Sequence, residues 1–431
     1  MGTCRIERGN FRGWRAIHLS NDLIKLVAVP DVGGRIMAYD LGPYPYVWID
    51  HDLAGKLFTP EENQGDGSLA AWKNYGGNRT WPSPQGWDND DQWHGPPDSV
   101  LDTGRYQVES ASSDERSATV TMASPTNAST GIQIRRRIAI HADSTRVDLD
   151  LTFLNVSDRP RTWSIWDIIQ LRSERTGPDG CLDYDPGCVV TAPINPASRH
   201  LKGFWVMFGS QDNPQWHADM SKGLFFGNLL WEIGKVGLDS RAGWAAFANS
   251  AGYAFAARAP IVPEADYPDN GSSVEFWTVG RGRVGNLSYE DTEIFLMEVE
   301  LLSPMKRMEP GETTAFHLEW GAARCPGPIL GVSDAGLTGK PLRLSRRGEY
   351  VSVEGNFGVF QPGNLHLDWQ ARDGQVLVSE DLGPASPLGA IILDRVFLAP
   401  ASSTRGAVVL NADDRSMSLA SADVQEAAGS I

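Results

Sequence analysis

Short segments in which apolar and polar residues alternate cover most of the chain, and turns rich in Gly, Pro and Asp separate them. Residues 132–141 (IQIRRRIAIH) and 145–154 (TRVDLDLTFL) show this pattern best, because their apolar side chains recur two residues apart. Such alternation is typical of a strand with one buried face. The two segments therefore predict an antiparallel hairpin. Residues 23–29 and 35–40 predict another strand pair, which a turn containing Gly33 and Gly34 separates.

The same pattern recurs along the chain. Further strands are predicted at 105–109, 118–122, 163–170, 203–208, 244–248, 254–257, 273–278 and 294–302. No segment keeps a helical period for more than about three turns. We therefore expect an all-β protein.

A change of composition at 322–328 (AARCPGP) suggests two domains. Residues 1–324 are expected to form one large β domain. After Ile329 come short strand patterns such as 349–354 and 364–369, enough for a small β-sandwich. Residues 325–431 are thus predicted to be an accessory domain, with a polar, mobile tail after Asp413.

The stretch 72–98 (WKNYGGNRTWPSPQGWDNDDQWHGPPD) places four tryptophans among Gly, Pro, Asn and Asp. Its prolines and glycines argue against both a helix and a central strand, so a long irregular loop is predicted. Flat aromatic faces beside polar side chains suit a sugar ring, which packs its C–H face on an aromatic group. The alternative is that the tryptophans close the open end of a β-sandwich. The residues concerned are Trp72, Trp81, Trp87 and Trp93, with Lys73, Asn78, Arg79 and His94 between them.

Composition supports a turn-rich β protein, since the 431 residues include 45 Gly, 27 Pro and 15 Trp. The formal net charge of −16 argues against nucleic acid and against an anionic membrane surface as partners. It does not exclude an anionic substrate, because a local group of Arg and Lys can oppose the overall field. The N-terminus lacks the apolar segment of a signal peptide, so we expect a cytoplasmic protein; a signal peptide that has been removed is the alternative.

Neither a metal nor a cofactor is expected. The eight histidines are scattered without zinc-like spacing, and the Gly33–Gly34 turn opens no phosphate-binding helix. Four cysteines are too few for a disulfide framework. Cys181 and Cys188 flank one loop and are either reduced thiols or a pair formed in an oxidising compartment.

Two glutamates stand out in the apolar strand predicted at 295–304. Glu298 and Glu300 share one face, opposite Met297 and Val299. Two neighbouring carboxylates raise the pKa of one of them, which suits general acid/base chemistry. The alternative is that this face is exposed to solvent or paired with arginine.

Two more acids are candidates. Asp167 lies in the aromatic segment 162–171, where a lone carboxylate needs a donor, so it is either functional or bonded to arginine or backbone groups. Glu275 points away from the face of Val274 and Phe276, and an ordinary solvated position is its alternative interpretation.

Several blocks resemble the galactose mutarotase-like (aldose 1-epimerase-like) proteins. They are 29–36 (VPDVGGRI), Leu154-Asn155, and 296–304 followed by 308–312 (MEPGE) and Trp320. The segment WKNYGGNRTWPSPQ resembles an uncharacterised branch of that superfamily. The resemblance covers roughly residues 15–322. It implies a supersandwich of antiparallel sheets, with a sugar site across one concave face.

The resemblance also implies a chemistry. The epimerases open and reclose a pyranose ring with a His as acid and a Glu as base. The Glu corresponds to Glu298 or Glu300, whereas Trp166-Asp167 stands at the position of the His. His94 or His217 is a possible replacement. An epimerase-like isomerase acting on a mono- or oligosaccharide is therefore the first expectation.

Two alternatives remain open. Other members of the fold are polysaccharide lyases, and for β-elimination Arg79 would hold a uronate carboxylate while Tyr75 or His94 takes the C5 proton. A carbohydrate-binding protein without catalysis is the other. The expected sugar-contacting residues are Trp72, Trp81, Trp87, Trp93, Lys73, Asn78, Arg79, Arg35, Glu275 and His217.

Overall fold

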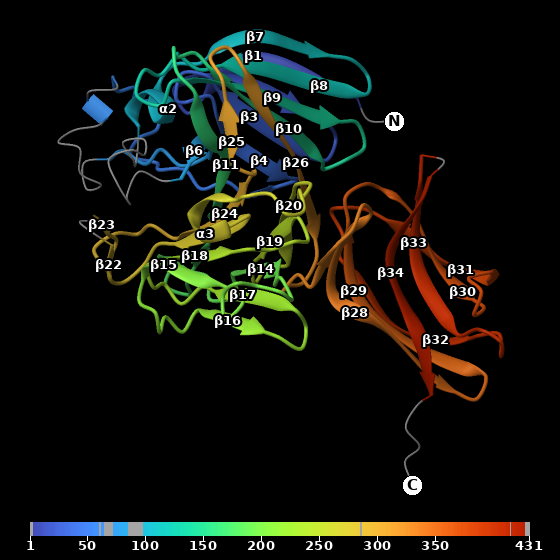
Figure 1. Ribbon diagram of the computed structural model, residues 1–431. Coiled ribbons are helices and arrows are strands. Elements are labelled where there is room, and N and C mark those ends of the chain that lie inside the picture. The colour runs from blue at the N-terminus through green and yellow to red at the C-terminus, as the bar shows by residue number, and fades with distance from the viewer. Residues whose placement is uncertain are drawn as a thin grey trace.

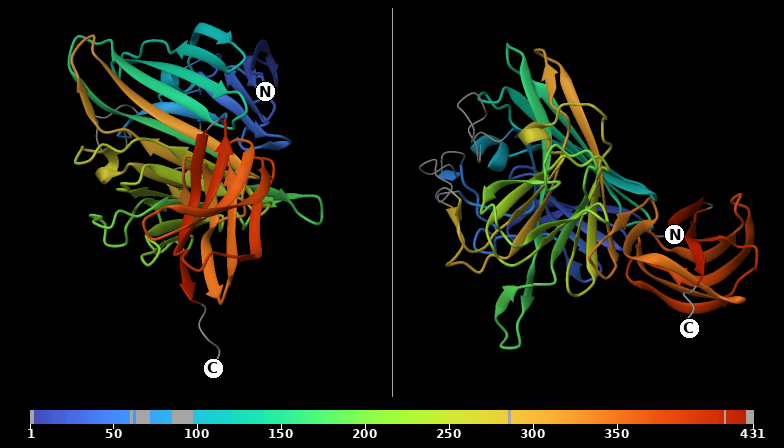
Figure 2. Two further views of the ribbon diagram at one scale, coloured as in Figure 1. Left: turned by 90° about the vertical axis from the view of Figure 1, so that its right-hand side faces the viewer. Right: turned by 60° about the horizontal axis from the view of Figure 1, so that its bottom comes forward.

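Strands dominate the computed structural model, which describes residues 3–59, 62–63, 72–84, 98–284, 287–413 and 415–426. Within these ranges, three large sheets account for most of the chain (Figure 1). Sheets I and II pack face to face, and sheet III lies to one side of them (Figure 2). The predicted all-β supersandwich is confirmed.

Sheet I has twelve described strands: β1 (Arg5–Phe11), β2 (Trp14–Ser20), β3 (Ile24–Val29), β4 (Arg35–Leu41), β5 (Tyr44–Pro45), β6 (Asn78–Ser83), β11 (Arg161–Arg172), β15 (Trp205–Gly209), β18 (Gly234–Leu238), β21 (Val274–Thr278), β24 (Leu296–Leu302) and β25 (Lys306–Met308). Sheet II has ten described strands: β7 (Gln107–Ser113), β8 (Ser117–Ala123), β9 (Ile132–His141), β10 (Val147–Asn155), β14 (Val189–Pro193), β16 (Trp216–Asp219), β17 (Leu224–Asn228), β19 (Trp244–Ala248), β20 (Tyr253–Arg258) and β26 (Thr313–Arg324).

Sheet III has eight described strands: β27 (Gly331–Val332), β28 (Gly336–Arg347), β29 (Tyr350–Val359), β30 (Gly363–Gln370), β31 (Val376–Ala385), β32 (Ile391–Leu398), β33 (Arg405–Ala412) and β34 (Arg415–Glu426). Two small hairpins and two short helices complete the described elements: β12 (Glu174–Thr176) with β13 (Leu182–Tyr184), β22 (Arg283–Val284) with β23 (Leu287–Ser288), α2 (Ser99–Thr103) and α3 (Pro268–Gly271). The β12–β13 hairpin projects from the body (green in Figure 2).

The main core lies between sheets I and II. Alternate residues of β10, from Val147 to Phe153, are fully buried, and the residues between them are half-exposed. Tyr39 of sheet I packs its ring 5.8 Å from that of Trp320 in sheet II, and its hydroxyl donates to the backbone oxygen of Thr145 at 2.5 Å. The period-two alternation therefore packs against the opposing sheet, as predicted for the hairpin of β9 and β10.

Part of the tryptophan-rich stretch forms a strand, which corrects the prediction of an irregular loop for residues 78–83. β6 pairs antiparallel with β11 along its whole length, so that Pro82 lies opposite Ile165. On its other side, β6 pairs with β4 at Asn78. No described strand therefore pairs with that side of Pro82, where a missing N–H removes no ladder bond. A proline is tolerated in such a position.

Two glycines set the entry into β6. Gly76 and Gly77 have φ of +86° and +84°, a conformation that side chains rarely adopt. A Cβ at Gly76 would stand 2.3 Å from the backbone oxygen of Trp48, and one at Gly77 would stand 2.9 Å from that of Ile36. The chain before β6 thus passes too close to its neighbours for any larger residue.

Sheet III has its own apolar centre, which includes Val353, Leu367 and Trp369. Residues 415–426, expected to be a mobile tail, form β34 instead, because Met417 and Leu419 are buried in this centre. β34 lies between β33 and β28 and pairs in parallel with β28. The domain boundary between 324 and 325 stays a prediction.

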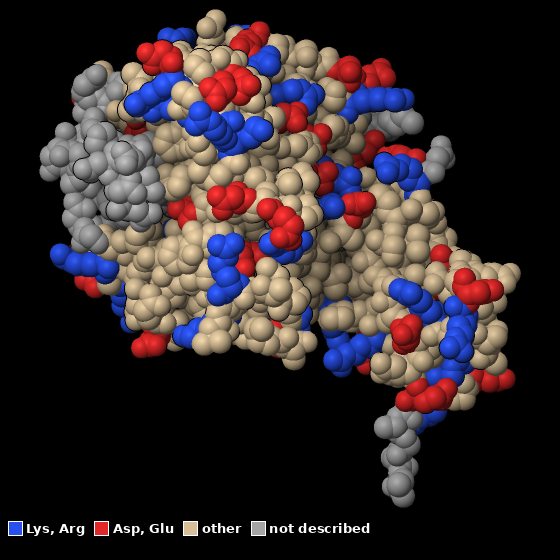
Figure 3. Space-filling view, in the orientation of Figure 1, with Lys and Arg blue, Asp and Glu red and all other residues tan. Residues whose placement is uncertain are grey.

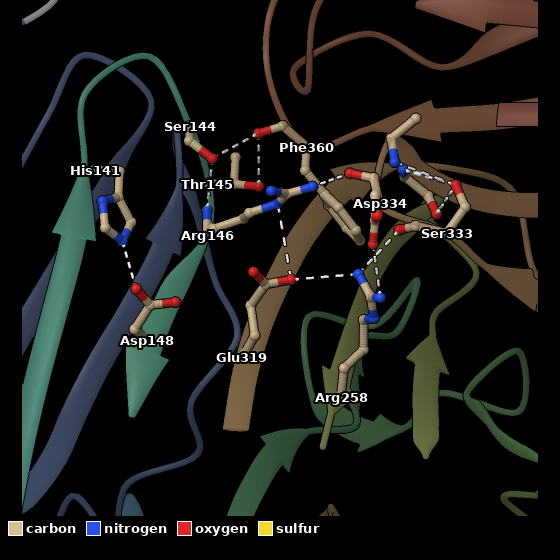
Figure 4. A network of polar contacts seen from close by, with 12 residues as sticks. His141, Ser144, Thr145, Arg146, Asp148, Arg258, Glu319, Ser333, Asp334 and Phe360 are labelled. Carbon is tan, nitrogen blue, oxygen red and sulfur yellow. Dashed lines mark hydrogen bonds and ion pairs between the residues drawn. The ribbon is translucent and has the colours of Figure 1, made fainter. Parts of the chain in front are cut away.

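Sheets II and III meet through both apolar and polar contacts. Phe360, which follows β29, is buried against Ala323 and Leu337, and its backbone oxygen accepts a bond from the N–H of Thr145 at 2.8 Å. Around it, Arg258 reaches Glu319 at 3.4 Å and Asp334 at 2.8 Å (Figure 4). We call the polar part, formed by Arg146, Arg258, Glu319 and Asp334, the junction network.

Acidic and basic side chains are interspersed over the face shown in Figure 3, and neither sign forms a single patch there. Among the residues described, no helix is long and apolar enough to cross a membrane. The four cysteines are free thiols, and Cys181 is exposed.

Candidate functional site

Polar side chains gather on five neighbouring strands of sheet I, in the order β6, β11, β24, β21 and β18. Glu298 lies opposite Gln170 on β11, and Glu300 lies opposite Glu275 on β21. Their neighbour Val299 points the other way, into the core between the sheets. Glu298 and Glu300 therefore share the face of sheet I that is turned away from sheet II, which we call the outer face.

Arg79 and Glu298 form a buried ion pair on this face. Nη2 of Arg79 lies 2.9 Å from Oε1 of Glu298, and Nε2 of Gln170 donates to the same oxygen at 2.6 Å. The guanidinium lies 4.4 Å from the ring centroid of Trp81 and 5.5 Å from that of Trp72, distances typical of cation–π contacts. Nε and Nη1 of Arg79 have no acceptor within the described part of the chain.

Lys235 lies between two carboxylates. Its Nζ is 2.8 Å from Glu275 and 2.9 Å from Glu300, and all three side chains are buried. Nε1 of Trp166 donates to Oε2 of Glu300 at 2.6 Å, and the Lys235 ammonium lies 4.2 Å from the Trp166 ring. We call Lys235, Glu275 and Glu300 the lysine triad.

The lysine triad holds one more carboxylate than it has cations. Burial raises the pKa of Glu300 to about 7 and the pKa of Glu275 well above its ordinary value. Burial lowers the pKa of Lys235, but the two carboxylates outweigh this and leave it raised. The ammonium therefore stays charged, and the two carboxyl groups retain a proton near neutral pH. A carboxyl that exchanges its proton near pH 7 is suited to acid/base catalysis.

Aromatic rings line the same face. Trp81 and Trp166 meet edge to face with their centroids 5.6 Å apart. Tyr289 is buried beside Glu298, and burial together with that carboxylate raises its pKa. Trp277 lies opposite Glu298 in the register of β21 and β24. These rings are buried and pack around the polar groups of this face.

Asp167 lies on the other face of β11, between the sheets. It accepts a bond from Nδ2 of Asn78 at 2.9 Å and another from Thr80 at 3.4 Å. Burial raises its pKa to about 6, although Arg136 opposes this. Asn78 in turn bonds to Arg136. The structure thus places Asp167 and Asn78 in an interior polar group, apart from Glu298 and Glu300.

Arg35 also lies in the interior, where it pairs with Asp102 and donates to the backbone oxygen of Gly76 at 2.8 Å. Asp102 accepts a bond from Nε1 of Trp72 at 2.9 Å. Tyr75 packs 6.0 Å from Trp14, and burial raises its pKa to about 12. Through Asp102, Arg35 is therefore linked to Trp72 in the tryptophan-rich segment.

Two of the predicted residues lie elsewhere. Lys73 donates to the backbone oxygen of Glu62 at 2.5 Å. His217 is exposed on β16 of sheet II, where it stacks on Phe226 at 5.2 Å. The predictions for Trp87, Trp93 and His94 fall outside the described residues. The structure thus brings together Arg79, Trp72, Trp81, Glu298, Glu300 and Glu275 from the predicted set.

Sequence reasoning missed Lys235, Gln170, Trp166 and Tyr289 as members of this site. Lys235 carried one usable signal, a lone lysine within the otherwise uncharged strand GKVGL. Gln170 and Trp166 carried a second signal. Like Ile168, they occupy alternate positions of β11, so the three side chains lie on the same face of the strand.

A family model described as "Domain of unknown function (DUF4380)" matches residues 15–175. A comparison with curated protein sequences finds no match.

Among solved structures, the chain is similar to a galactose mutarotase-like protein from Clostridium acetobutylicum, with 12% identity, a TM-score of 0.48, and coverage of 75% of this chain and 99% of that one. It is also similar to a galactose mutarotase related enzyme from Lactobacillus acidophilus, with 11% identity, a TM-score of 0.43, and coverage of 71% and 97%. Both TM-scores lie below 0.5, and the fold is defined by the three sheets of the chain alone.

Proposed function

We propose that the protein is a carbohydrate-active enzyme that performs acid/base chemistry at a sugar ring, on the outer face of sheet I. The lysine triad is the observation that carries this proposal. It supplies a carboxyl group with a pKa near 7, Glu300, which is buried among tryptophans and fixed polar groups. Residues with shifted pKa values that lie among potential binding groups are candidates for catalysis.

The two strand carboxylates suit different roles. Glu298 is ion-paired with Arg79 and is therefore the carboxylate that would accept the proton of the anomeric hydroxyl. Glu300 shares the retained proton of the lysine triad and would donate it to the ring oxygen, as the bond from that oxygen to the anomeric carbon breaks. The reverse transfers reclose the ring. Successive side chains on one strand face are roughly 7 Å apart, so the two carboxyl groups would act at different atoms of one sugar ring.

A second candidate is β-elimination on a uronate-containing glycan. The observation that favours it is Arg79, whose Nε and Nη1 have no acceptor within the described part of the chain. A guanidinium with two free donors suits a carboxylate. Tyr75 and His94 remain predictions for the base of this reaction.

The test is a sugar panel that includes neutral aldoses and a uronate oligomer. The proposal expects faster anomeric interconversion of an aldose, followed by polarimetry. It expects Glu300→Gln and Glu298→Gln each to lower kcat/KM by roughly 100-fold or more. Glu354→Gln, on the solvent side of sheet III, is the control and should change nothing.

Other outcomes point elsewhere. A product that absorbs in the near ultraviolet would identify a lyase. A shift of tryptophan fluorescence on sugar binding, without turnover of any substrate, would identify a binding protein. Full activity in both glutamine variants would refute the assignment of β24.

A further inference from the structure

A cavity opens on the outer face of sheet I, near the end of β11. Its volume is about 170 Å³. The lining residues used below are Phe11, Arg12, Asp40, Trp48, His51 and Arg172. None of them belongs to the lysine triad or to the Arg79–Glu298 pair.

The cavity lies next to the Arg79–Glu298 pair along β11. Arg172 stands two residues beyond Gln170 on β11 and so points to the same face, roughly 7 Å farther along. Gln170 bonds Glu298, and its backbone oxygen accepts a bond from the N–H of Trp48 at 2.9 Å. Trp48 lines the cavity and also packs in the apolar cluster that contains Trp277, the residue opposite Glu298.

The lining carries both signs of charge. Arg172 is paired with Glu174 at 2.6 Å, and Nη1 of Arg12 donates to Nδ1 of His51 at 2.6 Å. Asp40 is half-buried, and its Oδ1 has no partner within the described ranges. Burial raises the pKa of Asp40 to about 6, while Lys25, Arg12 and Arg172 oppose the rise. The carboxylate of Asp40 thus lines the cavity and keeps one buried oxygen without a donor among the described residues.

The charges of the cavity lining indicate which kind of ligand would bind there. The acids Asp40, Glu174 and Glu293 outnumber the two arginines of the lining, so a phosphate or another dianion would be repelled. A purely apolar ligand would leave the charged groups without partners. A neutral polyhydroxyl group satisfies both conditions, because its hydroxyls donate to Asp40 and accept from arginine, and its C–H face packs on Trp48 or Phe11.

We propose that this cavity is a second sugar subsite, and that the substrate is therefore an oligosaccharide of at least two units. One unit lies at the Arg79–Glu298 pair, and a neutral unit lies between Asp40, Arg172 and Trp48. The inference rests on the proposed function, which places the first unit. The β12–β13 hairpin borders the cavity through Glu174 and Leu182, so it would flank the far unit.

The test is calorimetric binding of a length series to the full chain. The probes are glucose, galactose, mannose, xylose and glucuronate, each with its di- and trisaccharide. For the sugar that binds, Kd should fall at least tenfold from the mono- to the disaccharide. Asp40→Asn, an isosteric change, should abolish this gain and leave the monosaccharide Kd unchanged. Arg12→Gln, at an exposed position, should reduce the gain without a risk to folding.

Asp114→Asn, in the turn between β7 and β8, is the matched control and should keep the full gain. Equal Kd values for mono- and disaccharide in the unmodified protein would overturn the second subsite and leave the proposed function intact. A length gain that Asp40→Asn and Arg12→Gln both preserve would also overturn it. Failure of every saccharide to bind would instead refute the proposed function, and with it this inference.

Discussion

Lys235 is the residue on which the charge balance of the outer face depends. It is the cation in contact with both Glu275 and Glu300, and all three side chains are almost completely buried. Breaking a buried ion pair by removing one partner typically costs 3–5 kcal/mol, because the other charge stays buried without compensation. The carboxylates can avoid part of that cost by taking up protons.

The effect of removing this cation should therefore depend on pH. The folded state holds the pKa of Glu300 at about 7, above its ordinary 4.5, so it binds more protons than the unfolded state between these values. Stability contributed by this group is present below pH 4.5 and is lost as the pH rises toward 7. Lys235→Met raises the folded pKa further. We expect a loss of about 3–5 kcal/mol at pH 8 and a much smaller loss near pH 4.5, measured by urea denaturation.

Lys340→Met provides the matched control. Lys340 contacts Glu354 at 2.6 Å, but both side chains are 44% exposed. An exposed pair contributes about 1 kcal/mol or less, so this variant should lose little stability at either pH. Equal losses in the two variants would mean that burial does not govern the lysine triad.

At the scale of elements, β6 links the two groups of predicted residues. One face of the strand carries Arg79 and Trp81, and the other carries Asn78 and Thr80, which bond Asp167 in the interior. The positive φ of Gly76 brings the preceding chain against Trp48. The position of Arg79 relative to Glu298 therefore depends on a turn that only glycine fits.

Substitution of that glycine tests the dependence. Gly76→Ala forces a Cβ to within 2.3 Å of a backbone oxygen, whereas Gly374, with a similar φ of +88°, has no atom within 4 Å of the corresponding position. Both variants pay about 1 kcal/mol for the backbone conformation. We expect Gly76→Ala to lose several kcal/mol more than Gly374→Ala in thermal or urea unfolding. Similar losses would show that the contact with Trp48 relaxes freely.

Alternation along the chain was enough to predict most strands and the shared face of Glu298 and Glu300, because a period of two is a local property. Strand β6 was wrongly predicted as a loop. Whether a strand tolerates a proline such as Pro82 depends on which of its two edges pairs with a neighbouring strand, and the local sequence does not contain that information. Lys235 was missed because its partners, Glu275 and Glu300, are distant in sequence and meet it only through the order of strands in sheet I.

At the scale of the whole molecule, two kinds of contact join sheets II and III. Phe360 is 1% exposed and packs in a cluster drawn from both sheets. In the junction network, the Asp334 side chain that Arg258 contacts is 75% exposed, so solvent screens the pair. Deleting a buried phenylalanine typically costs 3–5 kcal/mol, whereas an exposed ion pair contributes about 1 kcal/mol or less.

We therefore expect Phe360→Ala to separate the unfolding of sheet III from that of sheets I and II, seen as a second transition in calorimetry. Arg258→Ala should keep a single transition with a small shift of Tm. If Arg258→Ala also produced two transitions, charge rather than apolar packing would hold the sheets together.

The central position of β34 in sheet III has a consequence for synthesis. Ribosomes synthesise the chain from the N-terminus, yet β34 must insert between β33 and β28. β28 is synthesised about seventy residues before β34. Sheets I and II can assemble while translation continues, whereas sheet III cannot be completed until residues 415–426 have been synthesised. Until then β28 has a vacant edge, so a ribosome that stalls near residue 413 would leave a nascent chain prone to aggregate.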